Sequence, residues 1–352
     1  IIMEGAYYNG QYLNRLERLG YSQAEIDNKL ESTFEEMFYG PEGVRLCHFA
    51  GPDMMYIEDT GNHDVRTEGM SYAMMFCVQM NRQKEFDCLW RWVVTHMYLT
   101  EGENAGYFAW SCHTDGSKNS DGPAPDGEEF FAMSLFFAAN RWGSGEGVLD
   151  YASWARRILH ACVHKGEEAG SGFPMWNPEN HLIKFVPNCE FTDPSYHLPH
   201  FYELFALWSD ECDRPFWHAA AAASRQYLRK ACHARTGLSA EYAEYDGRPH
   251  RGDQPDRHDW FFSDAYRTLG NIALDAQWFG DKDGWAQETA AHIQQFFEEK
   301  EHGQTNGIYL IDGTPVEGNA LHPVGLLATI AQGSLILDDA CADEWLRRFF
   351  ST

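Results

Sequence analysis

Apolar residues recur every three to four positions along most of the chain, which predicts a mainly helical protein. The first helix is expected to begin at a capping box, Ser22-Gln-Ala-Glu25, and to end near Tyr39, before Gly40-Pro41. Residues 1–21 lack this pattern and are expected to form an irregular arm, whereas Val44 to Glu58 predicts two short strands. Further helices are expected near residues 68–81, 84–99, 127–141, 149–165, 194–209, 213–231, 262–279, 284–299, 322–336 and 343–350.

These later helices form close pairs that are separated by long polar loops. The first helices of the pairs begin near residues 68, 127, 195, 264 and 322, at intervals of about 58 to 69 residues. The first helix of each pair is the more apolar, as expected for a helix enclosed on all sides. Inner and outer helices that alternate in this way predict an all-α fold, an (α/α)6 barrel with short β-hairpins in its loops, in one catalytic domain that spans residues 1–352.

The helical repeat supplies five inner helices, one fewer than the barrel needs. A sixth inner helix would have to lie beyond Thr352. Either the given chain stops before its natural end, or the ring is closed in another way.

Composition narrows the class of ligand. Aromatic residues make up 15 % of the chain, with 12 Trp, 17 Tyr and 23 Phe. Flat aromatic side chains often bind sugar rings, although a large helical core also uses them. The formal net charge is −26, from 27 Lys and Arg against 53 Asp and Glu. Such a surface repels nucleic acid and anionic membranes, so neither is expected as a partner.

Cysteines and apolar runs indicate the compartment. The nine cysteines are odd in number and show no C-x-x-C spacing, which favours reduced thiols in a cytoplasmic protein. No signal-like run opens the chain and no run reaches membrane-spanning length. A cytoplasmic location is therefore expected. The sequence does not give the oligomeric state, for which a monomer is the expectation. No metal and no cofactor are expected in the protein. One polar loop could be read as a metal cluster, but it lacks ligand spacing on a defined element: its residues are His250, Asp253, Asp256, His258 and Asp259.

Acidic residues stand where the inner helices begin. The five starts carry, in chain order, Glu68, Asp126, Asp193, Asp264 and His322. The helix dipole explains one acid at such a position, but four acids that converge at one end of a barrel indicate a shared site. Two carboxyl groups in an aromatic cleft suit glycoside hydrolysis, in which one is protonated and the other is ionised.

Four segments resemble the catalytic segments of glycoside hydrolase family 8, in the expected order and over most of the chain. They are Arg66-Thr-Glu-Gly-Met-Ser-Tyr-Ala-Met-Met75, Pro125-Asp-Gly-Glu-Glu-Phe-Phe-Ala132, Ser195-Tyr-His-Leu-Pro199 and Phe261-Phe-Ser-Asp-Ala-Tyr-Arg267. A fifth, Asn319-Ala-Leu-His-Pro323, resembles the Leu-His-Pro loop of the reducing-end xylose-releasing exo-oligoxylanases in that family. The resemblance implies a hydrolase that releases xylose from the reducing end of β-1,4-xylo-oligosaccharides.

The resemblance also implies an inverting mechanism with three carboxyl groups. Glu68 matches the general acid, Asp264 the general base, and Asp126 the carboxylate that holds the sugar at the cleavage subsite. Inversion requires the acid and the base to stand roughly 6.5–9.5 Å apart. A helix N-terminus and Arg267, one turn on, are expected to keep Asp264 ionised. Glu68 has the same dipole, so nearby carboxylates and apolar burial would have to keep it protonated.

Exo action requires one end of the substrate groove to be closed. The resemblance assigns this role to the loop from Asp312 to Pro323, in which His322 would bond the reducing-end hydroxyl with Arg66 close by. The alternative is that His322 caps or packs against the helix that Pro323 begins.

Four aromatic residues are candidates for sugar-stacking platforms because each lies in or beside a cleft loop. They are Trp110, Trp176, Tyr196 and Phe261, and each is about equally consistent with a core position. The neighbours of Trp110 and Tyr196 match the family, which favours these two.

Three other functions stay open. The chain could be an endo-acting family 8 xylanase, glucanase or chitosanase, which product analysis distinguishes. It could be a sugar epimerase or isomerase on the same barrel type, with His63, His197 and His322 in the cleft. It could also be a non-catalytic oligosaccharide-binding barrel, in which binding would survive the loss of Glu68 and Asp264.

Overall fold

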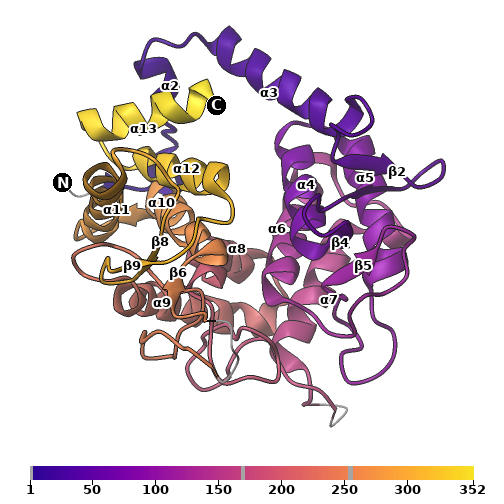
Figure 1. Ribbon diagram of the computed structural model, residues 1–352. Helices are drawn as coiled ribbons and strands as arrows, with labels where there is room; N and C mark the ends of the chain where they lie inside the picture. Colours follow the sequence, from indigo (N-terminus) through magenta and orange to yellow (C-terminus); the bar gives the residue numbers. More distant parts are fainter. Residues whose placement is uncertain (1–2, 168–170, 253–256) are drawn as a thin grey trace.

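The computed structural model describes residues 3–167, 171–252 and 257–352 (Figure 1). The predicted alternation of inner and outer helices is confirmed. The inner helices are α4 (Thr67–Gln79), α6 (Pro125–Trp142), α8 (Pro199–Trp208), α10 (Arg267–Phe279) and α12 (Pro323–Gln332). The outer helices are α5 (Gln83–Trp92), α7 (Tyr151–His164), α9 (Arg214–Ala231), α11 (Trp285–Glu301) and α13 (Ala340–Ser351). Each inner helix packs against its outer partner, and successive inner helices from α4 to α12 pack against each other.

Short helical turns and strands complete these pairs. The π-helix η1 (Val93–Met97) extends α5, and the 3-10 helices are η2 (Gly147–Leu149), η3 (Pro194–Tyr196), η4 (Glu211–Asp213), η5 (Ser263–Tyr266) and η6 (Gly333–Leu335). The antiparallel strand pairs are β1 (Met3–Glu4) with β7 (Gly280–Asp281), β2 (Cys47–Phe49) with β3 (Met55–Ile57), and β4 (Asp64–Arg66) with β5 (Ser111–His113). The three-stranded sheet contains β6 (Trp260–Phe261), β8 (Ile308–Leu310) and β9 (Pro315–Val316) in the order β6-β8-β9. The strand pair predicted between Val44 and Glu58 is confirmed as β2 and β3.

One predicted helix is divided in the structure. The segment expected to be helical from residue 194 to 209 consists of η3 and, after a break, α8. Pro199 causes the break because its ring disfavours a helical conformation of the residue before it. Leu198 accordingly has φ −122° and ψ 63°.

The N-terminal segment is more regular than expected. It contains β1 and two single-turn helices, α1 (Ala6–Asn9) and α2 (Arg15–Arg18), before the long helix α3 (Gln23–Tyr39). The predicted capping box at the start of α3 is confirmed, with Ser22 and Glu25 each bonding the backbone of the other. The prediction of a wholly irregular arm is wrong, since Asn14 caps α2 and Gly10 ends α1 in a left-handed conformation.

Helix α3 joins the last helix pair to the first. It runs from the side of α13 to the side of α5 along the outside of the barrel (Figure 1). The Lys29 ammonium donates to the Phe350 carbonyl at 2.7 Å, and two residues further along α3 Glu31 pairs with Arg82, which precedes α5. The described residues contain no sixth inner helix, so in this part of the chain α3 bridges the sector between the fifth pair and the first.

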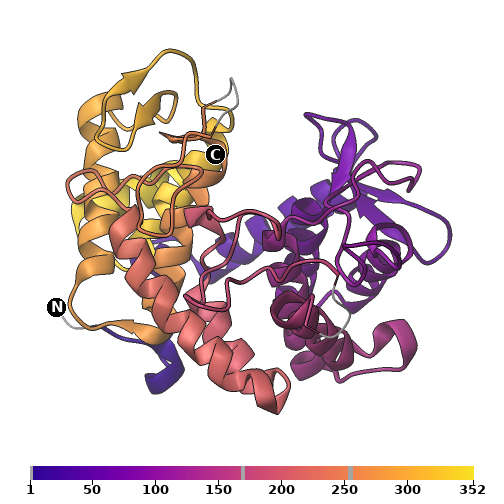
Figure 2. The ribbon, with the colours of Figure 1, turned by 90° about the horizontal axis from the view of Figure 1, so that it is seen from below.

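The buried apolar side chains that the structure describes form two main clusters, one with residues from Phe34 to Ala221 and the other with residues from Leu228 to Trp345. Figure 2 shows the half that contains α4 to α7 beside the half that contains α10 to α13. A close approach at the start of α6 fixes the position of the first two inner helices. A Cβ atom on Gly127 would lie 2.5 Å from the Thr67 side chain, so glycine is needed at this position for α4 and α6 to meet. Among the described residues, no helix has the length and apolar character needed to cross a bilayer.

Candidate active site

Arg267 is the centre of a polar cluster at the N-terminal ends of the inner helices. Its Nη1 atom donates to the Asp126 carboxylate at 2.8 Å and to the Tyr72 hydroxyl at 2.7 Å. Its Nη2 atom donates to the Ser195 hydroxyl at 3.2 Å and lies 3.4 Å from Asp264 Oδ1. One guanidinium thus connects residues from α4, α6, η3 and η5. Charge-assisted bonds of this kind hold side chains in fixed geometry.

Glu68 and Asp126 form a coupled pair of carboxyl groups beside this guanidinium. A side-chain hydrogen bond joins them, and the Asp126 side chain is 3 % exposed. Burial, followed by the charge of Asp126, raises the pKa of Glu68 to about 8. Burial also raises the pKa of Asp126, although the charge of Arg267 opposes this effect. Glu68 is therefore the proton donor of the pair at neutral pH.

Two further buried carboxyl groups face the same cluster. Burial and the charge of Asp264 raise the pKa of Asp193 to about 8. Burial raises the pKa of Glu241 to about 9, together with the negative charges of Asp264 and Asp193. Since Arg267 is one positive charge among several carboxyl groups, the mutual repulsion of these groups favours retention of protons. A protonated Glu68 requires burial and nearby carboxylates, and the structure provides both.

Asp264 is the most exposed carboxyl group of the cluster, with 37 % of its side chain accessible. It lies in η5, directly after Ser263, whose φ of 43° is unusual for a residue other than glycine. Its backbone N–H donates to the Glu241 carboxyl group, which His258 also contacts at 3.2 Å. These contacts hold a strained turn that presents Asp264 to solvent, as is common where function requires a defined geometry.

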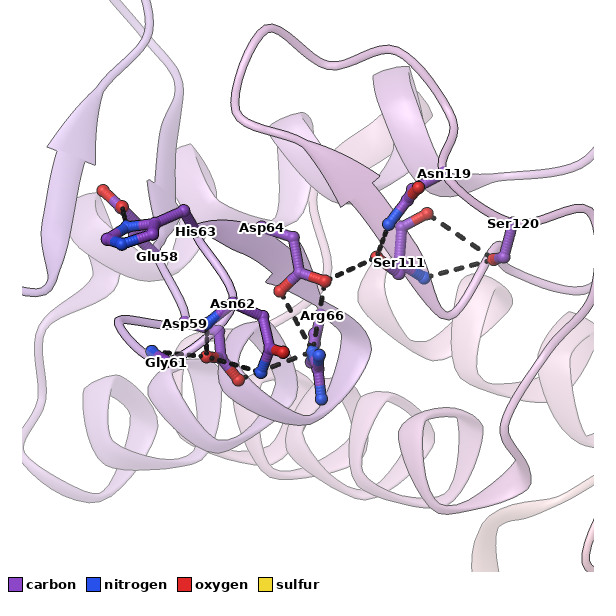
Figure 3. Close-up of polar contacts among 10 residues, drawn as sticks. All are labelled: Glu58, Asp59, Gly61, Asn62, His63, Asp64, Arg66, Ser111, Asn119 and Ser120. Carbon is purple, nitrogen blue, oxygen red and sulfur yellow. Dashed lines mark hydrogen bonds and ion pairs between the residues drawn. The ribbon is translucent and has the colours of Figure 1, made fainter. Parts of the chain in front are cut away.

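A second polar network fixes the loop before Glu68 (Figure 3). The Arg66 Nε atom donates to Asp64 at 3.0 Å, and Asp64 in turn accepts from the Ser111 hydroxyl at 2.9 Å. The Arg66 guanidinium lies 5.2 Å from the centre of the Trp110 ring, which is 38 % exposed. The Thr67 N–H donates to the Trp110 carbonyl at 3.0 Å. An exposed indole is thus held next to the first turn of α4, where Glu68 lies.

His322 occupies the N-cap position of α12 but makes no side-chain capping bond there. Its side chain is exposed, as is that of Leu321. The loop that carries His322 follows β8 and β9, and β8 pairs with β6 immediately before the Asp264 turn. The same small sheet therefore anchors both the Asp264 segment and the 312–323 loop, and the histidine is neither a packed nor a capping residue.

Comparison with known proteins decides the family. Residues 21–336 match the profile described as "Glycosyl hydrolases family 8". The chain belongs to glycosyl hydrolase family 8. The family 8 exo-oligoxylanases have the (α/α)6 barrel fold, and the five described helix pairs of this chain follow that arrangement.

Individual members of family 8 are also very similar. The chain is 55 % identical over 333 residues to the "Reducing end xylose-releasing exo-oligoxylanase" of Halalkalibacterium halodurans, a match that covers 94 % of this chain and 84 % of that protein. It is 54 % identical over 353 residues to the "Reducing-end xylose-releasing exo-oligoxylanase Rex8A" of Paenibacillus barcinonensis, over 99 % of this chain and 91 % of that protein. A structure of a Rex8A mutant complexed with 3(3)-alpha-L-arabinofuranosyl-xylotetraose aligns with a TM-score of 0.96, at 53 % identity, over 99 % of this chain and 91 % of that chain.

Two of the four proposed stacking residues are in the core of this family 8 barrel. Trp176 is 1 % exposed and packs edge-on against Trp217, with ring centres 4.9 Å apart. Phe261 is 3 % exposed and contacts Phe297 behind the β6-β8-β9 sheet. The prediction that these two rings are open platforms is wrong, because neither ring face is accessible to a sugar.

Tyr196 and Trp110 differ from those two residues. The Tyr196 ring is 2 % exposed, so the prediction that it is an open platform is wrong as well, but it lies 5.6 Å from the Arg267 guanidinium and therefore belongs to the polar cluster. Trp110 stays a prediction as a platform, with its exposed face available. The sequence reasoning missed Tyr72, although it lies one helical turn after Glu68 and i,i+4 spacing would have placed it on the same face.

The structure also locates the other histidines and acids that the sequence analysis considered. His197 is fully buried between Thr192 and Ser224, and burial lowers its pKa to about 3. His63 is exposed and contacts Glu58 at 2.9 Å. Neither is a catalytic-type histidine in the cluster around Arg267. In the loop discounted as a metal site, Asp253 and Asp256 lie outside the described residues.

Proposed function

We propose that this protein hydrolyses β-1,4-xylo-oligosaccharides and releases xylose from the reducing end. The observation that carries the proposal is the similarity, at 54–55 % identity over nearly the whole chain, to two proteins named for that activity. The carboxyl cluster around Arg267 supports hydrolysis, since it combines a protonated and a more exposed carboxyl group in one site.

In the proposed mechanism, two carboxyl groups act on opposite sides of the scissile bond. The Glu68 carboxyl gives its proton to the glycosidic oxygen as the bond between that oxygen and the anomeric carbon breaks. Asp264 takes a proton from a water molecule, whose oxygen attacks the anomeric carbon from the other face. The products are xylose and a shortened oligosaccharide with inverted, α, configuration. We expect the two carboxyl groups to stand roughly 6.5–9.5 Å apart in the substrate complex.

Asp126 and Arg267 have supporting roles in this mechanism. Asp126 is ion-paired at 2.8 Å and therefore rigid, which suits a group that bonds the hydroxyls of the distorted sugar. Its charge also helps to keep the proton on Glu68. Arg267 limits the total negative charge, so the site can hold several carboxyl groups at neutral pH.

The deciding experiment is hydrolysis of xylotriose labelled at its reducing end, followed by anomer analysis at early times. Labelled xylose with α-xylobiose is expected. Unlabelled xylose would mean release from the non-reducing end. No cleavage of xylotriose but cleavage of longer chains at internal bonds would favour the endo-acting alternative. Interconversion of free monosaccharides without bond cleavage would favour the epimerase, and binding without turnover would favour the non-catalytic barrel.

Replacing His322 by Ala is expected to loosen the exo restriction. The exposed imidazole at the end of the 312–323 loop is available to bond the reducing-end hydroxyl, and a lost hydrogen bond of this kind costs about 1 kcal/mol. We expect a fall of roughly fivefold to tenfold in kcat/KM on xylotriose and new internal cleavage products from xylohexaose. A matched control is His218→Ala, which removes an exposed histidine of α9. Unchanged products in the His322 variant would contradict the assignment.

A further inference from the structure

Two histidines and an aspartate meet where two outer helices approach each other. His160 and His164 lie one helical turn apart near the end of α7, and Asp213 lies at the start of α9. One potential ligand atom from each of the three residues lies within 4.8 Å of the others. The family 8 mechanism uses none of these residues, and the sequence analysis expected no metal site in the protein.

The spacing of the three side chains fits a tetrahedral ion after a small adjustment. His164 Nε2 lies 2.7 Å from Asp213 Oδ1, and His160 Nδ1 lies 3.9 Å from Asp213 Oδ2. Zinc binds nitrogen and oxygen ligands at about 2.0–2.1 Å, which places neighbouring ligands of a tetrahedron roughly 3.3 Å apart. The two distances run to different oxygens of Asp213 and lie on either side of this spacing, and the three ligand atoms lie within 4.8 Å of one another.

Burial and hydrogen bonding distinguish this cluster from a chance group of surface residues. The Asp213 side chain is 4 % exposed, and its two oxygens face the two imidazoles. The other ring nitrogen of His164, Nδ1, lies 2.8 Å from Glu167. A carboxylate on that nitrogen is the usual outer partner of a metal-bound histidine, because it fixes the tautomer that directs Nε2 to the ion.

His164 is held between two carboxylates, with Nδ1 2.8 Å from Glu167 and Nε2 2.7 Å from Asp213 Oδ1. This arrangement directs Nε2 to the buried carboxylate that also faces His160, so one cation at this point would contact both helices. We propose that His160, His164 and Asp213 bind a zinc-like divalent transition metal that links the end of α7 to the start of α9.

The donor set selects the class of metal. Two imidazoles and one carboxylate suit zinc and neighbouring transition metals, whereas calcium and magnesium prefer sites made of oxygen ligands. A fourth ligand can come from water or from the exposed Cys212 thiol, whose sulfur lies 3.6 Å from Asp213 Oδ1. An ion bound to the folded state alone would stabilise it in proportion to its concentration.

Zinc titration of untagged, EDTA-treated protein tests the site. Calorimetry is expected to give one equivalent of bound Zn²⁺, and the melting temperature is expected to rise with zinc concentration. His160→Ala should weaken zinc binding by more than tenfold and abolish the rise in melting temperature. The His160 side chain is 47 % exposed, so its truncation is expected to leave the fold intact. Glu167→Gln should weaken binding by about 10-fold, at the lower end for an outer partner, since its side chain is 63 % exposed.

His218→Ala is the matched control, since it removes an exposed histidine of α9 outside the cluster and should leave zinc affinity unchanged. Circular dichroism should show the same helix content for all variants. Cobalt(II) in place of zinc should give a tetrahedral visible spectrum, and loss of any sulfur-to-metal band in Cys212→Ser would identify the fourth ligand. The proposal is overturned if no zinc binds, if binding is unaffected by His160→Ala, or if His218→Ala weakens it equally. In those cases the cluster is a protonated ion pair only.

Discussion

Replacing Glu68 by Gln is expected to lower kcat on xylotriose by about 10²–10⁴-fold, the usual worth of a positioned general acid. The substitution is nearly isosteric. Its amide N–H can donate to Asp126 in place of the carboxyl proton, so the Arg267 cluster should keep its geometry. KM should change little, because the substrate contacts persist and only the transferable proton is lost. Rapid-quench or steady-state assays of xylose release measure the effect.

The pH dependence of kcat shows whether the Glu68→Gln variant has lost a general acid or only a group that supports the structure of the site. In the wild type, kcat should fall as the pH rises through about 8, where Glu68 loses its proton. The Gln variant should lack this alkaline decline. It should also regain most of its activity on β-xylobiosyl fluoride, because fluoride leaves with little protonic assistance. A variant that stayed equally slow on the fluoride, or one with wild-type kcat on xylotriose, would exclude Glu68 as the acid.

The pH dependence of the free energy of unfolding gives an independent measure of the Glu68 pKa, and its direction can be predicted. The folded-state pKa of Glu68 is raised from 4.5 to about 8, so the folded protein binds more protons than the unfolded chain between those values. The free energy of unfolding that Glu68 contributes is therefore full at low pH and is lost as the pH rises through that window. Urea titrations of wild type and Gln variant should converge in acid and diverge in favour of the variant at alkaline pH.

The sequence was sufficient to predict the barrel because its signals are local. Apolar periodicity defines each helix, and glycine and proline residues mark the ends, so the pairs and their spacing can be read directly. Glu68, Asp126 and Asp264 could be selected as candidates because each begins or immediately precedes an inner helix. Their convergence on Arg267 follows from the barrel topology, which places those starts at one end.

Contacts between distant segments could not be predicted in the same way. Glu241 lies in a loop without periodic pattern, and its bond to the Asp264 backbone appears only in three dimensions. Trp176 and Phe261 were misassigned because proximity to a cleft loop says nothing about which way a ring points. The closure by α3 was missed since it depends on contacts such as Lys29 to Phe350, which are 321 residues apart.

The protonation state of the site is a collective property of the fold. Asp126, Asp193 and Asp264 each raise the pKa of at least one neighbouring carboxyl group, while Arg267 opposes the rise. Removing one charge should therefore change the titration of the others. Loss of the Asp264 charge should thus change the pH dependence of activity as well as its rate.

Replacing Asp264 by Asn is expected to lower kcat on xylotriose by about 10²–10⁴-fold, because the amide cannot accept the proton of the attacking water. Asp259→Asn is the matched control. It lies five residues earlier in the same loop, and its carboxylate pairs with Arg257 at 2.7 Å rather than with the Arg267 cluster. The control should retain near-normal turnover and the same melting temperature as the wild type.

The pH profile of kcat distinguishes two roles of Asp264. One is to accept a proton from the attacking water, and the other is to raise the pKa of Glu68 through its negative charge. Its negative charge raises the pKa of Glu68, so the Asn variant should lose its residual activity at a lower pH than the wild type does. A merely structural role would lower activity without moving this alkaline limb. The Asn variant could instead keep kcat within about tenfold of the wild type, a much smaller loss than removal of a general base causes. In that case the attacking water would have to be activated by another group. Glu241 would then be the next candidate, since it bonds the Asp264 backbone but would first have to ionise at a pKa of about 9.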